Sequence, residues 1–219
     1  MPGPASGNQR EPLTVAIVQR VLRQYRIPFY EALRLFLRDR GVELRLIYGE
    51  PSSSDQTRHD TGDITWGVRI PTRIISVGSR SVCWQPCLHY LRGCHLVIVE
   101  QASRLVLNYV LLAGQCVGGP PVAFWGHGRN FQAHSASAIG ERIKAIVSRW
   151  PHWWFAYNDK SARVVRSLGY PSDRLTVVQN AVDTAELREA RGRTTTASLD
   201  SLRAEFGING QNVAIVVGG

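Results

Sequence analysis

Several patterns that would assign a function at once are missing from this sequence of 219 residues. It contains neither a GxGxxG nor a phosphate-loop glycine pattern, so dinucleotide-dependent dehydrogenases and phosphate-loop NTPases lose their main support. It also lacks GxSxG, the nucleophile turn of α/β-hydrolases. No apolar run approaches the roughly 20 residues that span a bilayer. No dense basic run with interleaved aromatics occurs, which argues against a nucleic-acid binder.

Cysteine is scarce. Four cysteines occur, with two histidines near them in the sequence: Cys83, Cys87, His89, Cys94, His95 and Cys116. Structural zinc sites usually show two close pairs of ligands, whereas only Cys83 and Cys87 are close here, so free buried cysteines are favoured over a metal site. Reduced thiols and the lack of a secretory leader predict a cytoplasmic location.

Positive charge, by contrast, is in excess. The chain has 26 lysines and arginines against 17 aspartates and glutamates, which gives a formal net charge of +9. A charge of this size favours anionic partners such as sugar phosphates or an acidic membrane surface. Nearly all of the excess is arginine, and it is spread over the whole length. Two explanations stay open: a functional role for the charge, and a GC-rich gene that encodes many arginines.

Short apolar runs alternate with longer amphipathic segments along most of the chain. The pattern predicts strands at 14–19, 42–48, 69–77, 95–100, 121–125, 153–157 and 175–180. Between them it predicts helices at 28–40, 84–92, 103–113, 136–149 and 159–168, and a polar loop at 50–68. This alternation indicates an α/β fold with a doubly wound, mostly parallel Rossmann-like sheet.

The composition also suggests a domain organisation. We expect residues 1–12 to form a flexible tail and residues 13–183 to form the Rossmann-like domain. Residues 184–211 are polar and helix-forming, as in a linker. Residues 212–219 read NVAIVVGG, which predicts the first strand of a second, truncated domain. Because a lone parallel strand cannot bury its faces, we expect further residues or another chain to complete that domain.

Ligands of open α/β sheets bind at the carboxyl ends of the strands, and this rule selects the first candidate residues. Tyr25 and Arg26 lie between the first strand and the helix that begins at Pro28, where neighbouring arginines would bind an anion or would form a solvated basic loop. Glu100 ends the strand at 95–100. Its carboxylate is suited to binding sugar hydroxyls or to acid–base work, and equally to the start of the next helix.

The sharpest local signal is the run Gly126-His127-Gly128-Arg129-Asn130, directly after the apolar strand at 121–125. Two glycines let the backbone turn tightly and approach a ligand closely. The histidine is then presented from the end of a strand, with an arginine and an amide near it. This placement favours a functional histidine over a structural one.

Five segments resemble family 4 glycosyltransferases, and they occur in the family's order. LTVVQNAVDT (175–184) is similar to the VIPNGVD stretch that ends the N-terminal domain in that family. The segments at 157–175 and 202–219 are similar to those that flank this stretch. Residues 25–49 resemble the family's opening unit, and residues 121–131 resemble its strand and histidine turn.

The resemblance implies a GT-B architecture, in which a first Rossmann-like domain holds mainly the acceptor and a second holds mainly the sugar nucleotide. It implies a retaining, metal-independent transfer of a hexose from a UDP- or GDP-linked sugar to a lipid-linked or polysaccharide acceptor, without a cofactor. His127 would then lie beside the transferred sugar as a catalytic residue. Asn180 and Asp183 fall in the hinge segment, where the resemblance implies an interdomain structural role.

Two departures from the family pattern matter. The paired glutamates and basic residues of the donor half have no counterpart in this sequence, and Arg23-Gln24-Tyr25-Arg26 replaces the usual Gly-Gly pair of the first loop. We therefore expect the chain alone to be inactive. The alternative is a non-catalytic acceptor-binding subunit that pairs with a separate donor-binding chain. A third option, an unrelated anion-binding domain, conflicts with the hinge segment. For the transferase we expect the cytoplasm, with the inner face of an anionic membrane as a further option.

Overall fold

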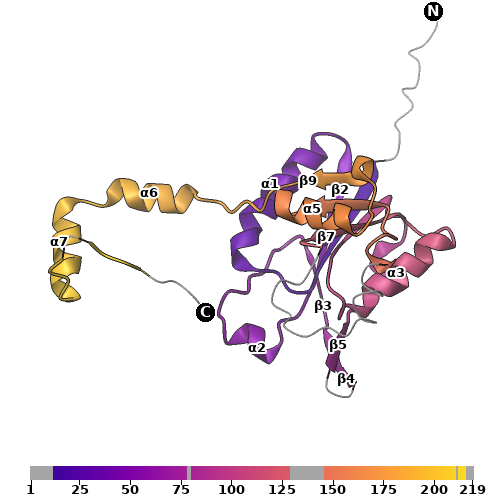
Figure 1. Cartoon of the computed structure of the whole chain (residues 1–219), viewed down its shortest axis with the longest axis horizontal. Helices are drawn as coiled ribbons and strands as arrows, with labels where there is room; N and C mark the ends of the chain where they lie inside the picture. The colour runs from indigo at the N-terminus through magenta and orange to yellow at the C-terminus, as the bar shows by residue number, and fades with distance from the viewer. Residues whose placement is uncertain (1–11, 78–79, 129–145, 211, 216–219) are drawn as a thin grey trace, which may run out of the picture. The chain divides into compact units, whose positions relative to one another are not determined.

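The computed structural model describes residues 12–77, 80–128, 146–210 and 212–215 (Figure 1). The chain divides into two units, residues 1–181 and 182–219. The larger unit contains a seven-stranded sheet with the strand order β3-β2-β1-β6-β7-β8-β9. Its strands are β1 (Leu13–Gln19), β2 (Val42–Gly49), β3 (Val68–Ile70), β6 (Leu96–Glu100), β7 (Val122–Gly126), β8 (Trp153–Ala156) and β9 (Leu175–Val177).

Every pair of neighbouring strands in this sheet is parallel. The chain runs from β1 outward through β2 to β3, then crosses back so that β6 pairs with the other side of β1. The remaining strands continue outward from β6. This order, with strands laid outward in both directions from the centre, confirms the predicted doubly wound Rossmann-like fold.

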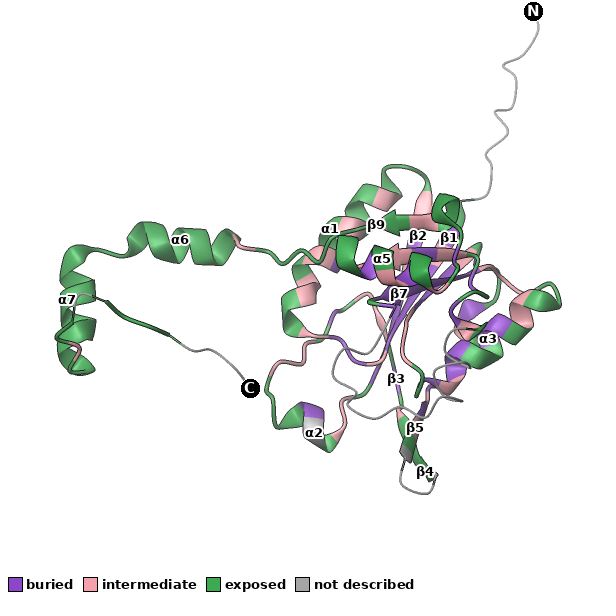
Figure 2. Cartoon of the chain, viewed as in Figure 1, coloured by how far each residue is buried: buried purple, intermediate pink, exposed green. Residues whose placement is uncertain are grey.

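Helices cover both faces of the sheet, as alternation along the strands requires. In β6, Val97 and Val99 point to one face, where they share a core with residues of α3 (Val106–Cys116) and α5 (Asp159–Ser167). Ile98 points to the other face, where the cluster includes side chains of α1 (Ile27–Arg38). Figure 2 shows the buried residues gathered in the strands between these helices.

The first strand–helix–strand unit follows from its sequence. α1 has Pro28 in its first turn, where a missing N–H costs nothing. Gly41 has a φ of 71°, a left-handed conformation that glycine adopts without strain, and it turns the chain from α1 into β2. Leu33 and Leu37 of α1 pack against the sheet, as the helical spacing predicts.

The segment between β3 and β6 differs from the prediction of one strand at 69–77. β3 ends at Ile70, and a second strand, β4 (Arg73–Val77), pairs antiparallel with β5 (Arg80–Trp84) in a separate two-stranded sheet. Pro71 lies between β3 and β4 and cannot donate a ladder hydrogen bond, so it separates them. The helix predicted at 84–92 is the single 3₁₀ turn η2 (Leu88–Leu91). The predicted loop at 50–68 contains a short helix, α2 (Ser53–Gln56).

Most of the helix predicted at 136–149 lies outside the described residues, and its described residues 146–147 are helical. Two further 3₁₀ turns, η1 (Gln24–Arg26) and η3 (Ser172–Arg174), precede α1 and β9. In the smaller unit, α6 (Ala185–Arg193) and α7 (Thr196–Glu205) have no buried residue. Residues 212–215, the described part of the strand predicted at 212–219, pair with no described strand, so the first strand of a second domain stays a prediction.

Trp154 provides a test of the core. Its side chain has no solvent exposure, its indole N–H donates to the Ser148 carbonyl at 2.9 Å, and its ring meets Phe124 edge-on. Trp154→Ala is expected to lower the free energy of unfolding by about 3–5 kcal/mol, because it leaves a cavity and an unpaired carbonyl. Chemical denaturation measures this loss, with Trp150→Ala as the control, since Trp150 is 50% exposed. Equal losses would contradict the packing described.

Candidate functional site

The carboxyl ends of β1, β6, β7 and β8 lie along one edge of the sheet, because the strands are parallel and adjacent. The chain reverses its direction of winding between β1 and β6, which is the place where open α/β sheets bind ligands. Tyr25, Arg26, Glu100 and His127 all follow or end strands of this set. The fold therefore places these predicted site residues at the same edge.

Arg26 is the centre of an aromatic cluster at this edge. Its Nη2 donates to the Tyr157 hydroxyl at 2.8 Å, and its Nε donates to the Tyr25 hydroxyl at 3.3 Å. Its guanidinium carbon lies 5.1 Å from the centre of the Trp125 ring and 5.5 Å from that of Tyr157. Cation–π contacts and hydrogen bonds therefore hold Arg26 in place between the loop after β1 and the end of β8.

Glu100 lies among the arginines of the site. Burial raises the pKa of its carboxyl group above the ordinary value, while the charges of Arg20, Arg26 and Arg104 oppose that rise. A carboxyl group in these surroundings holds a proton at higher pH than an exposed glutamate does. The carboxyl group of Glu100 is therefore shifted towards its protonated form, in which it can donate a hydrogen bond to a hydroxyl or exchange a proton with one.

His127 is oriented by the start of α5. Its Nδ1 lies 3.0 Å from the Ser161 hydroxyl, which itself donates to Asn158 Oδ1 at 3.0 Å. In the neutral ring, Nδ1 shares one hydrogen with the Ser161 hydroxyl, as donor or as acceptor according to the tautomer. Burial lowers the pKa of His127, which favours that neutral form. The ring also stacks on Tyr157, with 4.5 Å between centres.

The two glycines beside His127 are required by packing within the chain. A Cβ on Gly126 would lie 2.8 Å from the Cβ of Gln101, and a Cβ on Gly128 would lie 2.7 Å from Val165. Gly128 also has a φ of 75°. The tight turn expected from the sequence is present, and the close approach at these glycines is to the protein's own side chains.

The other site residues predicted from the sequence are Arg129, Asn130, Asn180 and Asp183. Arg129 and Asn130 lie outside the described residues. Asn180 is exposed at the end of the larger unit, and Asp183 belongs to the smaller unit, where its Oδ1 accepts from the Ala185 N–H at 2.9 Å as α6 begins. A contact of this kind supports the start of the helix.

The sequence did not reveal the ion-pair network behind the site. Arg20 binds Asp55 through two hydrogen bonds of 2.7 and 2.6 Å, and Arg23 binds the same carboxylate at 2.8 Å. Arg23 also pairs with Asp60. The loop after β1 therefore contains two arginines, Arg20 and Arg23, whose anions are carboxylates of the chain itself. For Arg26 in the same loop, an anion site stays a prediction. The signal that could have revealed the network is Ser52-x-x-Asp55, a capping box that starts α2.

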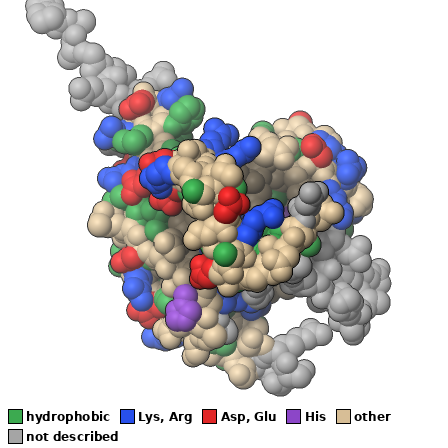
Figure 3. Space-filling view, turned by 90° about the vertical axis from the view of Figure 1, so that its left-hand side faces the viewer, with side chains coloured by type: hydrophobic (Ala, Val, Ile, Leu, Met, Phe, Trp, Pro, Cys, Tyr) green, Lys and Arg blue, Asp and Glu red, His purple; other side chains and the backbone are tan. Residues whose placement is uncertain are grey.

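Two other observations bear on cofactors and membranes. Cys83, Cys87 and Cys94 are buried free thiols and Cys116 is an exposed one, and burial raises the pKa of Cys87 to about 12. Among the described residues, no group of three or more His, Cys, Asp or Glu side chains is arranged to hold a metal ion. The described helices include none that could cross a bilayer. Figure 3 shows basic and acidic side chains intermixed on the face in view.

The fold and this edge define a Rossmann-like α/β domain of the kind that makes up half of a GT-B chain. Comparison with protein-family models and with curated sequences finds no match. Solved structures do match in fold. HepE from Anabaena in complex with UDP-glucose aligns with a TM-score of 0.52 and 12% identity, over 89% of this chain and 50% of that one.

Two further solved structures also match in fold. A complex of MnaA from S. aureus with UDP aligns with a TM-score of 0.51 and 12% identity, over 87% of this chain and 51% of that one. The UDP-GlcNAc 2-epimerase of Methanocaldococcus jannaschii, in complex with UDP-GlcNAc and UDP, aligns with a TM-score of 0.50 and 12% identity, over 89% and 53%. The chain thus spans about half the length of the structures it matches, and the likeness is one of fold.

Asp55→Asn tests the ion-pair network. We expect it to lower the free energy of unfolding by about 3 kcal/mol at neutral pH, because two nearly buried guanidiniums lose their carboxylate. Hydrogen bonds from Arg20 hold the pKa of Asp55 well below its ordinary value, so its contribution is present above about pH 4 and declines as the pH falls further. The difference in free energy of unfolding between wild type and Asp55→Asn should therefore become smaller as the pH falls towards about 3.

Urea unfolding at neutral pH and at about pH 3 measures this difference in free energy of unfolding. Asp60→Asn is the matched control, because Asp60 pairs with the same Arg23 but its side chain is 43% exposed. We expect a loss of at most about 1 kcal/mol for that variant. If the difference in free energy of unfolding between wild type and Asp55→Asn stayed constant with pH, the ion pair would not be the cause of the lost stability.

Proposed function

We propose that this chain is the acceptor-side half of a family 4 glycosyltransferase, which transfers a hexose from a sugar nucleotide to a lipid-linked or polysaccharide acceptor. The observation that carries this proposal is the placement of His127 and Glu100 at one edge of the sheet, with Arg26 and Tyr157 between the loop after β1 and the histidine. The resemblance in sequence to this family, in five ordered segments, supports it.

In this proposal the chain works together with a donor-binding half, in the same polypeptide or in a partner chain. UDP is the first nucleotide to test, because HepE, MnaA and the epimerase were each solved with UDP or a UDP-sugar. His127 binds the transferred sugar from the acceptor side, through a ring that the Ser161 hydroxyl orients. Glu100 binds or deprotonates the acceptor hydroxyl.

His127→Ala tests the role of the histidine in the complete enzyme. We expect kcat to fall by about 100-fold or more, the usual range for losing a group that exchanges a proton or a hydrogen bond with the reacting atoms. The melting temperature should change little, because the side chain is exposed. In the wild type, activity should fall as the pH drops through the pKa of His127, which burial holds below the ordinary 6.5.

The matched control is His152→Ala, since His152 is an exposed histidine at the opposite end of β8. The assay follows release of UDP or GDP and transfer of labelled sugar, and it also scores epimerisation of the donor, because the fold is shared with an epimerase. A His127→Ala enzyme with normal turnover, or one that loses stability as much as activity, would contradict the proposed role. Epimerisation without transfer would replace the transferase proposal.

The second candidate is a non-catalytic acceptor-binding subunit. The observation that favours it is that Arg23-Gln24-Tyr25-Arg26 replaces the Gly-Gly pair of the family's first loop, and that Arg23 is paired with Asp55 and Asp60 of the chain itself. Under this candidate the chain retains its acceptor affinity when mixed with a donor-binding partner, and the mixture shows no sugar transfer unless the partner supplies the catalytic groups. Transfer that depends on His127 decides for the first candidate.

We also propose that α1 contacts an anionic membrane surface. Leu35 and Phe36 are 51% and 53% exposed on this helix, and Arg38 and Arg40 lie beside them. Apolar side chains next to basic ones are suited to a membrane interface that contains anionic lipids. The chain's positive net charge acts in the same direction.

Co-sedimentation with vesicles that contain phosphatidylserine tests this contact. We expect binding to weaken steeply between about 0.05 and 0.5 M salt, because the attraction is screened. Replacing Arg38 and Arg40 with Glu should abolish most of the binding. The same exchange at the exposed Arg163 and Arg166 of α5 is the control for net charge. Binding that ignores salt, or equal losses in both pairs, would contradict a contact through α1.

A further inference from the structure

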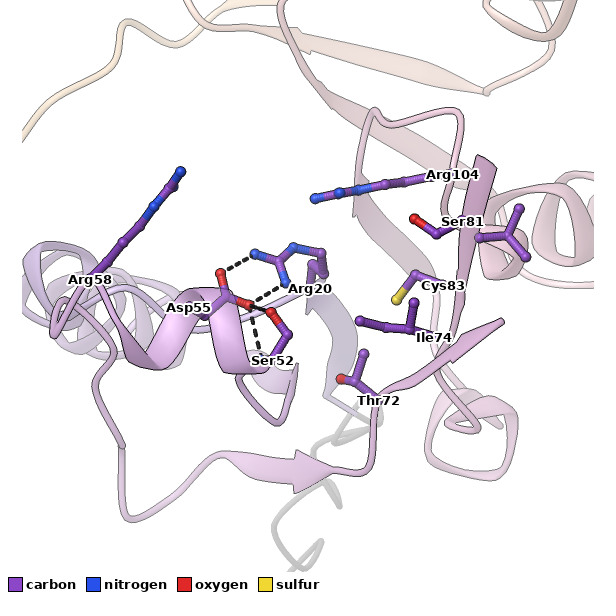
Figure 4. A pocket seen from close by; sticks show the side chains of 10 residues that line it. Arg20, Ser52, Asp55, Arg58, Thr72, Ile74, Ser81, Cys83 and Arg104 are labelled. Carbon is purple, nitrogen blue, oxygen red and sulfur yellow. Dashed lines mark hydrogen bonds and ion pairs between the residues drawn. The ribbon is translucent and has the colours of Figure 1, made fainter. Parts of the chain in front are cut away.

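A pocket of about 260 Å³ lies next to the site, on the side of Arg20 that faces α2 and the β4–β5 ribbon. Arg20 comes from the loop after β1, Arg58 follows α2, and Arg104 precedes α3. Ser81 and Cys83 line it from β5. Figure 4 shows Arg58 and Arg104 reaching in from opposite sides, with Arg20 between them.

The charge of this pocket is not balanced within the part of the chain that is described. Asp55 is the one carboxylate among the lining residues, and Arg20 and Arg23 already bind it. Neither Arg58 nor Arg104 forms an ion pair with a described carboxylate. Two guanidinium groups are therefore left to attract an anion from solution.

The floor of the pocket is fixed before any ligand arrives. The side chains of Arg20 and Asp55 are only 14% and 5% exposed, and Asp55 also closes the capping box of α2 through Ser52. The β4–β5 ribbon forms the opposite wall, to which β5 contributes the Ser81 hydroxyl (Figure 4). Arg58 and Arg104 line the pocket beside this fixed floor, and arginine binds oxyanions through paired hydrogen bonds.

The pocket adjoins the proposed catalytic edge. Arg20 follows β1, Glu100 ends β6 and Arg104 follows β6, so the pocket and the proposed catalytic edge share the carboxyl ends of these two strands. A volume of about 260 Å³ is several times the roughly 30 Å³ that one water occupies in the liquid. The pocket therefore has room for an anionic group together with part of a sugar ring, and such a ligand would extend from the pocket towards the end of β6.

We propose that this pocket binds the oxyanion of an acidic glycosyl acceptor, either a phosphate or a sugar carboxylate, through Arg58, Arg104 and Ser81. That the ligand is a glycosyl acceptor rests on the proposed function. The proposed function leaves the chemical class of the acceptor open, and the pocket assigns it as acidic. Arg20 acts as a positioning residue, because Asp55 occupies its two terminal nitrogens. The anion fixes the acceptor so that a hydroxyl on its ring faces the end of β6.

Calorimetry on the 219-residue chain tests the pocket without any enzymatic assay. The probes are inorganic phosphate, glucuronate and glucose, each at low salt. We expect phosphate, glucuronate or both to bind, and glucose to bind at least tenfold more weakly. Arg104→Gln and Arg58→Gln should each weaken anion binding by about tenfold, because each removes a charge-assisted hydrogen bond. Both side chains are exposed, so the fold should survive, and melting temperatures check this.

Arg166→Gln is the matched control, since it removes the same charge from an exposed site on α5. Tighter binding of phosphate would indicate a phosphorylated acceptor, and tighter binding of glucuronate an acidic sugar, and either supports the proposal. Anion binding that Arg58→Gln and Arg104→Gln leave unchanged, or that equals the binding of glucose, overturns it. Sugar transfer to a neutral acceptor, measured separately, would then still support the proposed function. Failure of the acidic-acceptor proposal can therefore be told apart from failure of the proposed function.

Discussion

The parallel pairing of β1 with β6 is the constraint on which the rest of the structure depends. Because these strands are parallel, their carboxyl ends meet at one edge, and because they are far apart in the chain, that edge combines segments that the sequence keeps separate. This pairing brings Arg26 after β1 and Glu100 at the end of β6 to the same edge, and the pairing of β6 with β7 adds His127. Residues buried on both faces of the strands, such as Val97 and Ile98, hold it in place.

Electrostatics at this edge follows from the same arrangement. Arg20 and Arg23 follow β1 and would repel each other if the short helix α2 did not place Asp55 between them. With Asp55 and Asp60 bound to these two arginines, Arg58, Arg104 and Arg26 remain as the cations that act on nearby groups. The charges of Arg20, Arg26 and Arg104 oppose the effect of burial on the pKa of Glu100. One buried ion pair thus separates arginines that stabilise the fold from arginines that are available to ligands.

The sequence predicted much of the fold, because strands buried on both faces appear as continuous apolar runs and helices as amphipathic ones. β1, α1 and β2 match their predicted ranges within one or two residues. The β4–β5 ribbon was missed because its residues continue an apolar run past Pro71, and a run cannot show which strand will be its partner. Asp55 was missed because it lies in a polar segment without periodicity.

By itself, the sequence determined the order of strands and helices, the tight turn at Gly128 and the placement of a histidine after a buried strand, since each depends on near neighbours in the chain. Only the tertiary structure decided that Ser161 orients His127, that Tyr157 joins it to Arg26, and that Arg58 and Arg104 face one pocket. These contacts join residues up to 131 positions apart. Local patterns do not encode such distances, because strand pairing and packing bring the partners together.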